Sequence, residues 1–403
     1  MFLEKEGKLI YSYDGETVCI EAWGKDALRV RATKNRSFTG RDWALEAKDA
    51  HAGEVEIFED PSAKGGAFAN MYEGTDTSYG KITNGKLHAV IDSGSVITFY
   101  HEDGRVLLKE HFRRLRDEES MPLNIMGREY SNGVGDNFRI VTRFVARKGE
   151  KIFGMGQYQQ HELDLKGCML ELAQRNSQVS VPFYLSSIGY GFLWNNPGVG
   201  QVMFANNGTE WVTESGKEID YLVIAGDTPA EIEENYMTLT GKPPMMPEYG
   251  MGFWQCKLRY WNQEQLLSVA RKYKELGVPL DVIVVDFFHW TKQGEFKFDP
   301  KYWPDVPGMC RELKEMGIQV VVSVWPTVDI YSENFEEMKE KGYLVRTEHG
   351  VPLTMLCGGN EVFFDATNPD ARTYVWEKFM ISRTTVISSE AYRRSEIFIR
   401  NII

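Results

Sequence analysis

Short apolar runs separated by polar turns dominate the chain from residue 9 to about residue 225. The runs at 86–92 and 95–100 are examples, in which apolar and polar residues alternate or β-branched residues follow one another. Such runs, bounded by glycine, asparagine and aspartate, are typical of antiparallel strands with one face in a core. The pattern predicts an N-terminal β-sandwich over residues 1–227.

The pattern changes at Thr228, where signals for a helix begin. Thr228 is a suitable N-cap, Pro229 fits the first helical position, and Glu231 can complete a capping box. A helix is therefore expected from there to Gly241, and the prolines that follow exclude its continuation. We assign residues 228–247 to this helix and a proline-rich linker.

Beyond the linker, apolar runs alternate with amphipathic helical patterns. Runs of strand type occupy three segments, at 251–255, 281–285 and 318–324. Helices are expected to begin after Asn262 and Asp305. Continuous β-branched runs are typical of parallel strands buried on both faces, and repeated βα units form barrels or doubly wound sheets. The predicted fold class is multidomain, an N-terminal β-sandwich followed by a partial (β/α)8 (TIM) barrel, with the first part of the barrel at 248–380 and a divergent tail at 381–403.

The composition of the chain limits the classes of partner. Its 403 residues include 58 acidic and 46 basic ones, which gives a formal charge of −12, and no long basic run occurs. That balance disfavours nucleic acid and anionic membrane surfaces, and a neutral substrate fits better. The N-terminus lacks the apolar core of a signal peptide and no apolar stretch of about 18 residues occurs, so we expect a cytoplasmic protein. A homo-oligomer is compatible with the sequence.

The cysteines predict neither a disulfide framework nor a metal site. They are five in number and widely scattered, at Cys19, Cys168, Cys256, Cys310 and Cys357. A zinc site or a thiol redox motif needs closely spaced pairs. We therefore expect reduced structural thiols, no metal and no cofactor.

Candidate functional residues follow from the geometry of a (β/α) barrel, in which working side chains lie just past the carboxyl ends of the strands. This position selects Trp254, Asp286, Phe288, His289, Trp290 and Trp325. Asp286 follows an apolar β-branched run, so its carboxylate is expected at the barrel rim, able to accept hydrogen bonds from two adjacent sugar hydroxyls. An N-cap or a buried salt bridge would explain the same aspartate.

The other candidates have less specific signals. Trp290 and Trp325 are expected to form apolar walls for a sugar ring. His289 is interpreted as a structural residue or a substrate contact in preference to a general base. Asn176, in the polar cluster 174–176 of the sandwich half, is a candidate to reach the barrel mouth, and a polar sandwich loop explains it equally well.

Six segments of the chain carry a family resemblance. They are Ile152–Gln157, Val181–Leu185, Gly189–Trp194, Met246–Trp254, Val285–Trp290 and Phe298–Pro304. In this order they resemble segments of glycoside hydrolase family 31, and the similarity covers nearly the whole chain up to about Phe379. Within the family, the runs at 252–257, 287–290 and 323–326 are more similar to α-xylosidase-like members than to maltose-cleaving α-glucosidases.

The resemblance implies a galactose mutarotase-like sandwich and a retaining α-glycosidase that works without a metal. Such an enzyme hydrolyses terminal α-xylosyl or α-glucosyl residues of an oligosaccharide or glycoside substrate. One aspartate forms a covalent glycosyl-enzyme and a second carboxylic acid protonates the leaving oxygen, with the two carboxyls about 5 Å apart. Asp286 matches the family's substrate-binding aspartate, and Trp325 matches its aromatic wall.

The chain departs from the family pattern at its C-terminal end. In the family the nucleophile follows the fourth barrel strand and the acid follows the sixth, whereas this chain stops well short of the roughly 250 residues of a full barrel. The resemblance therefore implies a truncated barrel, no assignable catalytic residue, and no turnover by the chain alone. Two alternatives remain: a carbohydrate-binding or interaction protein that uses the sandwich without catalysis, and an enzyme completed by a separate chain.

Overall fold

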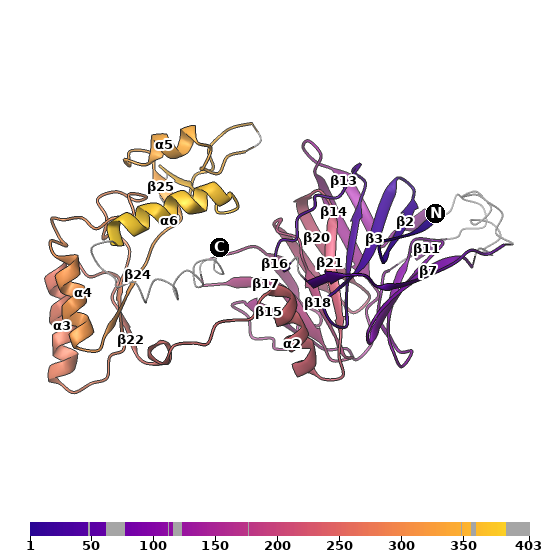
Figure 1. Ribbon diagram of the computed structural model, residues 1–403, viewed down its shortest axis with the longest axis horizontal. Helices are drawn as coiled ribbons and strands as arrows, with labels where there is room; N and C mark the ends of the chain where they lie inside the picture. Colours follow the sequence, from indigo (N-terminus) through magenta and orange to yellow (C-terminus); the bar gives the residue numbers. More distant parts are fainter. Residues whose placement is uncertain are drawn as a thin grey trace. The chain divides into compact units, whose positions relative to one another are not determined.

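The computed structural model describes residues 1–46, 49–61, 77–111, 113–115, 123–175, 177–347, 349–355 and 360–383. The chain divides into two compact units, Met1–Pro243 and Pro244–Ile403, with the boundary inside the proline-rich segment. The first unit is built mainly of strands and the second carries most of the helices (Figure 1). Each unit is described by itself below.

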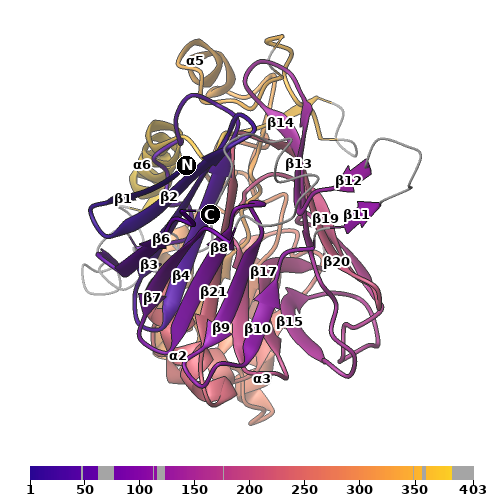
Figure 2. The ribbon, with the colours of Figure 1, turned by 90° about the vertical axis from the view of Figure 1, so that its right-hand side faces the viewer.

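The largest sheet of the first unit has nine antiparallel strands. Its order is β1 (Phe2–Lys5), β2 (Lys8–Tyr13), β3 (Glu16–Trp23), β4 (Ala27–Thr33), β21 (Ile219–Ala225), β18 (Tyr190–Trp194), β17 (Val179–Ser186) and β15 (Ile152–Gln157), and β5 (Ala50–His51) pairs with β3. Figure 2 looks onto this unit, with β3, β4 and β21 side by side. Strands β1 to β4 follow one another along the chain, and β21, from the end of the first unit, pairs with β4.

Three further groups of strands complete the first unit. One sheet has the order β13 (Arg128–Asn132), β14 (Phe138–Phe144), β20 (Thr209–Gly216), β19 (Gly200–Phe204) and β16 (Met169–Leu172). Another has the order β10 (Val106–Lys109), β9 (Ile97–His101), β8 (Leu87–Asp92), β7 (Tyr79–Asn84) and β6 (Glu54–Phe58). The short strands β11 (Arg113–Leu115) and β12 (Leu123–Ile125) pair with each other.

Aromatic side chains from facing sheets form the core of the sandwich. Phe192 of β18 lies 5.1 Å from Trp211 of β20 and 5.3 Å from Phe144 of β14, measured between ring centroids. All three side chains are fully buried. Burial of large rings contributes much of the stability of such a core, and the offset and edge-to-face contacts add to it.

A helix covers the outer face of the nine-stranded sheet. Helix α2 (Pro229–Thr240) packs Ile232 and Leu239 against residues of β18 and β21. The predicted N-cap and proline are present, because the Thr228 hydroxyl accepts a hydrogen bond from the Glu231 amide at 3.2 Å and Pro229 occupies the first turn. The Glu231 carboxylate accepts from the Asp227 amide at 3.0 Å, one residue before the amide that the predicted capping box would use. Gly241, with a φ of 96°, ends it.

The second unit begins with a parallel sheet, as the βα pattern predicts. Strands β22 (Trp254–Cys256), β23 (Val282–Val285) and β24 (Gln319–Val322) lie in chain order, with β23 in the middle. The other elements are the 3-10 helix η2 (Glu248–Met251), helices α3 (Gln263–Glu275), α4 (Val306–Glu315), α5 (Phe335–Glu340) and α6 (Pro369–Arg383), and the antiparallel pair β25 (Thr327–Asp329) and β26 (Glu361–Phe363). The sheet order fits the opening strands of a barrel.

The crossover helices begin at the predicted caps. The Asn262 side chain accepts a hydrogen bond from the Gln265 amide at 2.9 Å, and the Asp305 carboxylate accepts one from the Gly308 amide at 2.8 Å. Apolar faces of α3 and α4 then pack with β23 in one cluster that includes Leu266, Ile283, Met309 and Leu313. The two helices therefore pack on the parallel sheet through this cluster.

The prediction that the run 318–324 is buried on both faces is wrong. Val322 is 36% exposed and Val324 is 39% exposed. Among the described residues β24 pairs only with β23, so it is an edge strand of this sheet. An apolar run therefore does not distinguish a central strand from an edge strand here.

Candidate functional site

The carboxylate of Asp286 lies at the carboxyl edge of the parallel sheet. Strand β23 ends at Val285, so Asp286 is the first residue beyond it. Its Oδ1 accepts a hydrogen bond from the Phe287 amide at 2.8 Å, and its Oδ2 lies 3.5 Å from Sγ of Cys256, the last residue of β22. Both of these partners are uncharged groups, which disfavours the salt-bridge alternative.

Aromatic rings from two strand ends meet beside this carboxylate. The ring of Phe287 stacks on Trp325, with centroids 5.3 Å apart and planes inclined by 18°, and it lies 4.1 Å from the ring of Phe288. Trp325 follows β24 by three residues. Residues after neighbouring parallel strands thus share one edge, as expected for the upper rim of a barrel.

Phe288 presents an exposed ring next to a guanidinium group. Its side chain is 52% exposed, and its backbone adopts a φ of 64°. The Arg259 guanidinium lies 4.7 Å from the Phe288 ring and 4.0 Å from the Trp261 ring. Stacking of this kind holds an arginine and an aromatic ring in a fixed mutual position.

His289 and Trp290 are buried under this edge. His289 is 4% exposed, its Nδ1 lies 3.2 Å from the carbonyl oxygen of Asp286, and its ring contacts those of Trp290 and Phe298. Burial lowers the pKa of His289 to about 4. A neutral, buried imidazole fits the predicted role of a structural residue better than the role of a general base.

Trp254 does not lie where the sequence predicts. The predicted strand 251–255 placed it near the carboxyl end, but β22 begins at Trp254 and runs to Cys256. Trp254 pairs with Val282, the first residue of β23, and its indole nitrogen donates to the Gly250 carbonyl at 3.1 Å. Trp254 therefore lies at the amino end of the parallel sheet, whereas Asp286 lies at its carboxyl end. The predicted position of Trp254 is wrong.

Cys256 and Arg259 are neighbours of the site that the sequence alone did not single out. The apolar run does not indicate that the strand continues to residue 256, and a lone cysteine predicts a structural thiol. Cys256 is exposed. The last candidate, Asn176, lies outside the described residues, so its part in the site stays a prediction.

The described residues offer neither a metal site nor a membrane-spanning helix. No group of three or more His, Cys, Asp or Glu side chains there could hold a metal ion. The described cysteines are free thiols, and Cys357 lies outside them. No described helix is both long and apolar enough to span a bilayer.

Sequence comparisons assign both units to one family. The Glycosyl hydrolase 31 N-terminal galactose mutarotase-like domain matches residues 17–202, and the Glycosyl hydrolases family 31 TIM-barrel domain matches residues 243–389. A protein of Pseudescherichia vulneris, named as an uncharacterized family 31 glucosidase, is 42% identical over 386 residues, which cover 93% of this chain and 70% of the relative. The chain belongs to glycoside hydrolase family 31. The predicted family and fold class are thereby confirmed.

Other family 31 proteins extend the comparison. Alpha-xylosidase A of Aspergillus niger is 30% identical over 380 residues, which cover 90% of this chain and 49% of that enzyme. The crystal structure of a family 31 α-xylosidase from a soil metagenome, complexed with xylose, is 46% identical with a TM-score of 0.83, covering 96% of this chain and 55% of that one. The chain thus spans about half the length of these two family 31 enzymes.

Proposed function

We propose that this chain supplies sugar-binding residues of a retaining α-glycosidase that removes terminal α-xylosyl residues, or α-glucosyl residues, from oligosaccharides. The observation that carries the proposal is the Asp286 carboxylate at the carboxyl edge of β23, beside the stacked rings of Phe287 and Trp325. A carboxylate with two oxygens accepts hydrogen bonds from neighbouring hydroxyls of one sugar ring, and aromatic rings pack on its apolar faces.

The contacts of Asp286 support a binding role. Its described partners are a neighbouring amide and a thiol, which is a weak donor, so both oxygens keep free lone pairs for hydroxyl groups. The buried His289 and Trp290 fix the loop that carries this carboxylate and Phe288. A binding group held by packed neighbours loses little conformational freedom when the ligand binds.

The xylosyl specificity is supported by relatives. Alpha-xylosidase A of Aspergillus niger and the xylose-complexed α-xylosidase carry that activity in their names. Glycoside cleavage with retention needs two carboxyl groups about 5 Å apart. We assign Asp286 to binding, and we assign neither of these two groups to a residue of this chain.

The test measures binding of D-xylose and D-glucose to the full chain by isothermal titration calorimetry. Asp286→Asn keeps the size of the side chain and removes its charge, and Asp370→Asn, in the exposed first turn of α6, is the matched control. We expect at least about tenfold weaker xylose binding in Asp286→Asn, because a hydrogen bond to a charged group contributes roughly 1.5–3 kcal/mol. Equal xylose affinity in both variants, or no xylose binding by the unmodified chain, would contradict the proposal.

A kinetic measurement addresses the activity itself. Release of the aryl group from an aryl α-xyloside and an aryl α-glucoside is followed with the unmodified chain and both variants. Where turnover is observed, a faster reaction on the xyloside supports xylosyl specificity, and a faster reaction on the glucoside favours the glucosyl alternative. The loss of activity in Asp286→Asn relative to Asp370→Asn then reports transition-state binding by the carboxylate.

A further inference from the structure

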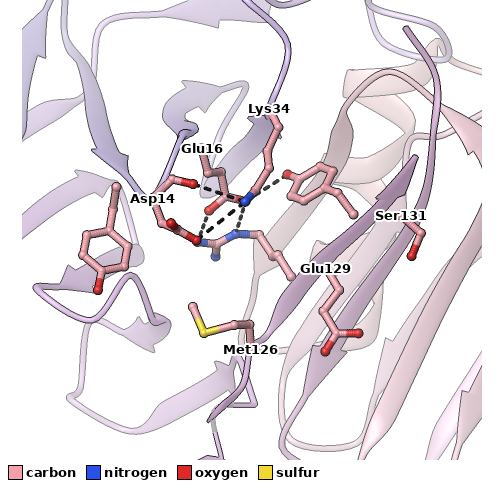
Figure 3. A pocket seen from close by; sticks show the side chains of 9 residues that line it. Asp14, Glu16, Lys34, Met126, Glu129 and Ser131 are labelled. Atoms are coloured by element: carbon pink, nitrogen blue, oxygen red, sulfur yellow. Dashed lines mark hydrogen bonds and ion pairs between the residues drawn. The ribbon is translucent and has the colours of Figure 1, made fainter. Parts of the chain in front are cut away.

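A hollow in the first unit lies between the turn of the β2–β3 hairpin and strand β13. Its lining includes Tyr13, Asp14, Glu16, Lys34, Met126 and Arg128, and its volume is about 370 Å³. We refer to these six residues and the space between them as the hairpin pocket (Figure 3). Its volume is at the small end of the roughly 300–1,000 Å³ of ligand pockets, which suits one or two sugar rings.

The floor of the hairpin pocket is a network of buried charged groups. Arg128 donates to both carboxylate oxygens of Glu16 at 3.0 Å, and to the carbonyl and hydroxyl oxygens of Ser95. It also donates to Glu110, which is 1% exposed. Burial lowers the pKa of Arg128, but the charges of Glu110 and Glu16 outweigh burial and raise it well above its ordinary value. The floor therefore keeps its charges in fixed positions.

A second pair of charges lies at the mouth. The Lys34 ammonium donates to the carbonyl oxygen of Asp14 at 3.1 Å and lies 3.6 Å from its carboxylate. Figure 3 shows Asp14, Glu16 and Lys34 pointing toward one another, while Glu129 lies apart from them. The Glu129 carboxylate pairs instead with Arg143 at 2.9 Å. Two carboxylates thus face two cations across the pocket.

This balance decides the kind of ligand. A phosphate or carboxylate ligand would meet cations that are already paired and would approach two carboxylates, which is unfavourable. A hydroxyl group both donates and accepts, so a polyol can use the remaining protons of the Lys34 ammonium and the one lone pair of Glu16 that Arg128 and the Tyr130 hydroxyl leave free. A neutral ligand rich in hydroxyls fits both sets.

Tyr13 and Met126 add apolar surface beside these polar groups. The Tyr13 ring is 38% exposed and stacks on Tyr11, with ring centroids 6.2 Å apart. An exposed ring held by a second ring offers a flat surface for the C–H face of a pyranose. Polar groups on one side and an aromatic face on the other are what a sugar ring requires.

We propose that the hairpin pocket is a binding site for a neutral carbohydrate, built within the sandwich unit and using none of the residues around Asp286. Lys34 and Glu16 would bind adjacent hydroxyls, and Tyr13 would stack on the ring. The Arg128 network holds Glu16 from below and acts as a positioning group. A site of this kind would retain an oligosaccharide independently of hydrolysis.

The test uses the full chain with Asp286→Asn, which removes the carboxylate assigned to the other sugar site. Binding of D-glucose, D-xylose and inorganic phosphate is measured by titration with ligand-observed NMR. Lys34→Ala and Tyr13→Ala remove the proposed contacts. Lys25→Ala and Tyr249→Ala, at exposed positions outside the pocket, are the matched controls. Circular dichroism checks that each variant stays folded.

We expect at least one of the two sugars to bind, and its affinity to fall about tenfold in Lys34→Ala and in Tyr13→Ala, with changes under about twofold in the controls. Equal affinities in pocket and control variants would overturn the proposal. So would the absence of sugar binding, or phosphate binding that is lost in Lys34→Ala while sugars do not bind. Failure here leaves the Asp286 measurement untouched, because that one compares variants of the second unit.

Discussion

Replacing Arg29 by methionine tests how far buried charge pairing supports the sandwich. Arg29 is fully buried, donates to both oxygens of Asp220 at 3.0 and 2.7 Å, and donates to Asp42 at 2.8 Å. Asn195 donates to the same Asp220 carboxylate at 2.8 Å. Burial raises the pKa of Asp220 to about 6, and the Arg29 guanidinium opposes a further rise. Arg29→Met therefore leaves a buried carboxylate with an amide as its remaining partner in this group.

The expected cost follows from that orphaned charge. Breaking a buried ion pair by removing one partner lowers the free energy of unfolding by about 3–5 kcal/mol. The folded-state pKa of Asp220 lies above its unfolded value, so the penalty for ionising it grows as the pH rises from 3.8 through the folded pKa. In Arg29→Met that pKa is higher still. The cost of the substitution is therefore largest at pH 8 and smaller at pH 5, where Asp220 is protonated in both proteins.

Urea unfolding followed by far-ultraviolet circular dichroism at pH 5 and pH 8 measures this cost. Asp220→Asn and the double variant complete a double-mutant cycle, in which Arg29→Met should cost less once the carboxylate has gone. A cost below about 1 kcal/mol at pH 8, or the same cost at both pH values, would refute the reasoning. An Arg29→Met cost that is unchanged when Asp220→Asn is also present would refute it as well.

Four further predictions concern stability, each read from urea unfolding of the full chain. Thr228→Ala should cost about 1 kcal/mol, because it removes the N-cap of α2, and Thr228→Ser should restore most of it. Leu313→Ala should cost about 2–5 kcal/mol, since the side chain is fully buried between α4 and the parallel sheet. Gly294→Ala should cost roughly 1–3 kcal/mol, because φ is 85° and a β-carbon would lie 2.7 Å from the Val328 α-carbon. Below pH 6.5 the free energy of unfolding should fall by up to roughly 3 kcal/mol by pH 4, because the folded pKa of His289 is depressed and protonation favours the unfolded chain; His289→Phe should remove this part of the pH dependence.

Much of the fold could be predicted because its signals are local. The caps Thr228, Asn262 and Asp305 bond to amides three residues further on, so the sequence itself contains both partners. The apolar runs likewise record which segments are strands. The family resemblance added the kind of sandwich and the expected substrate class, which local patterns do not contain.

The rest depends on contacts between distant residues. Strand ends have no capping signal. The sequence predicts a strand over 251–255, whereas β22 runs from Trp254 to Cys256, so Trp254 lies at its start and Cys256, at its end, lies beside Asp286. The exposure of Val322 depends on what lies beside β24, which an apolar run does not reveal. The hairpin pocket has no sequence signature at all, because Glu16 and Arg128 are 112 positions apart and meet only when β3 approaches β13.

The central place of β23 in the parallel sheet has a dynamic consequence. Its amides and carbonyls pair on both sides, with β22 and with β24, whereas each of these has one described partner. Amide protons of a doubly paired strand exchange with solvent only in the largest opening events. Asp286 follows that strand directly, so the group that we assign to sugar recognition should keep its position while the flanking strands fray. Of the three strands of this sheet, residues 282–285 should exchange their amide protons for deuterium last.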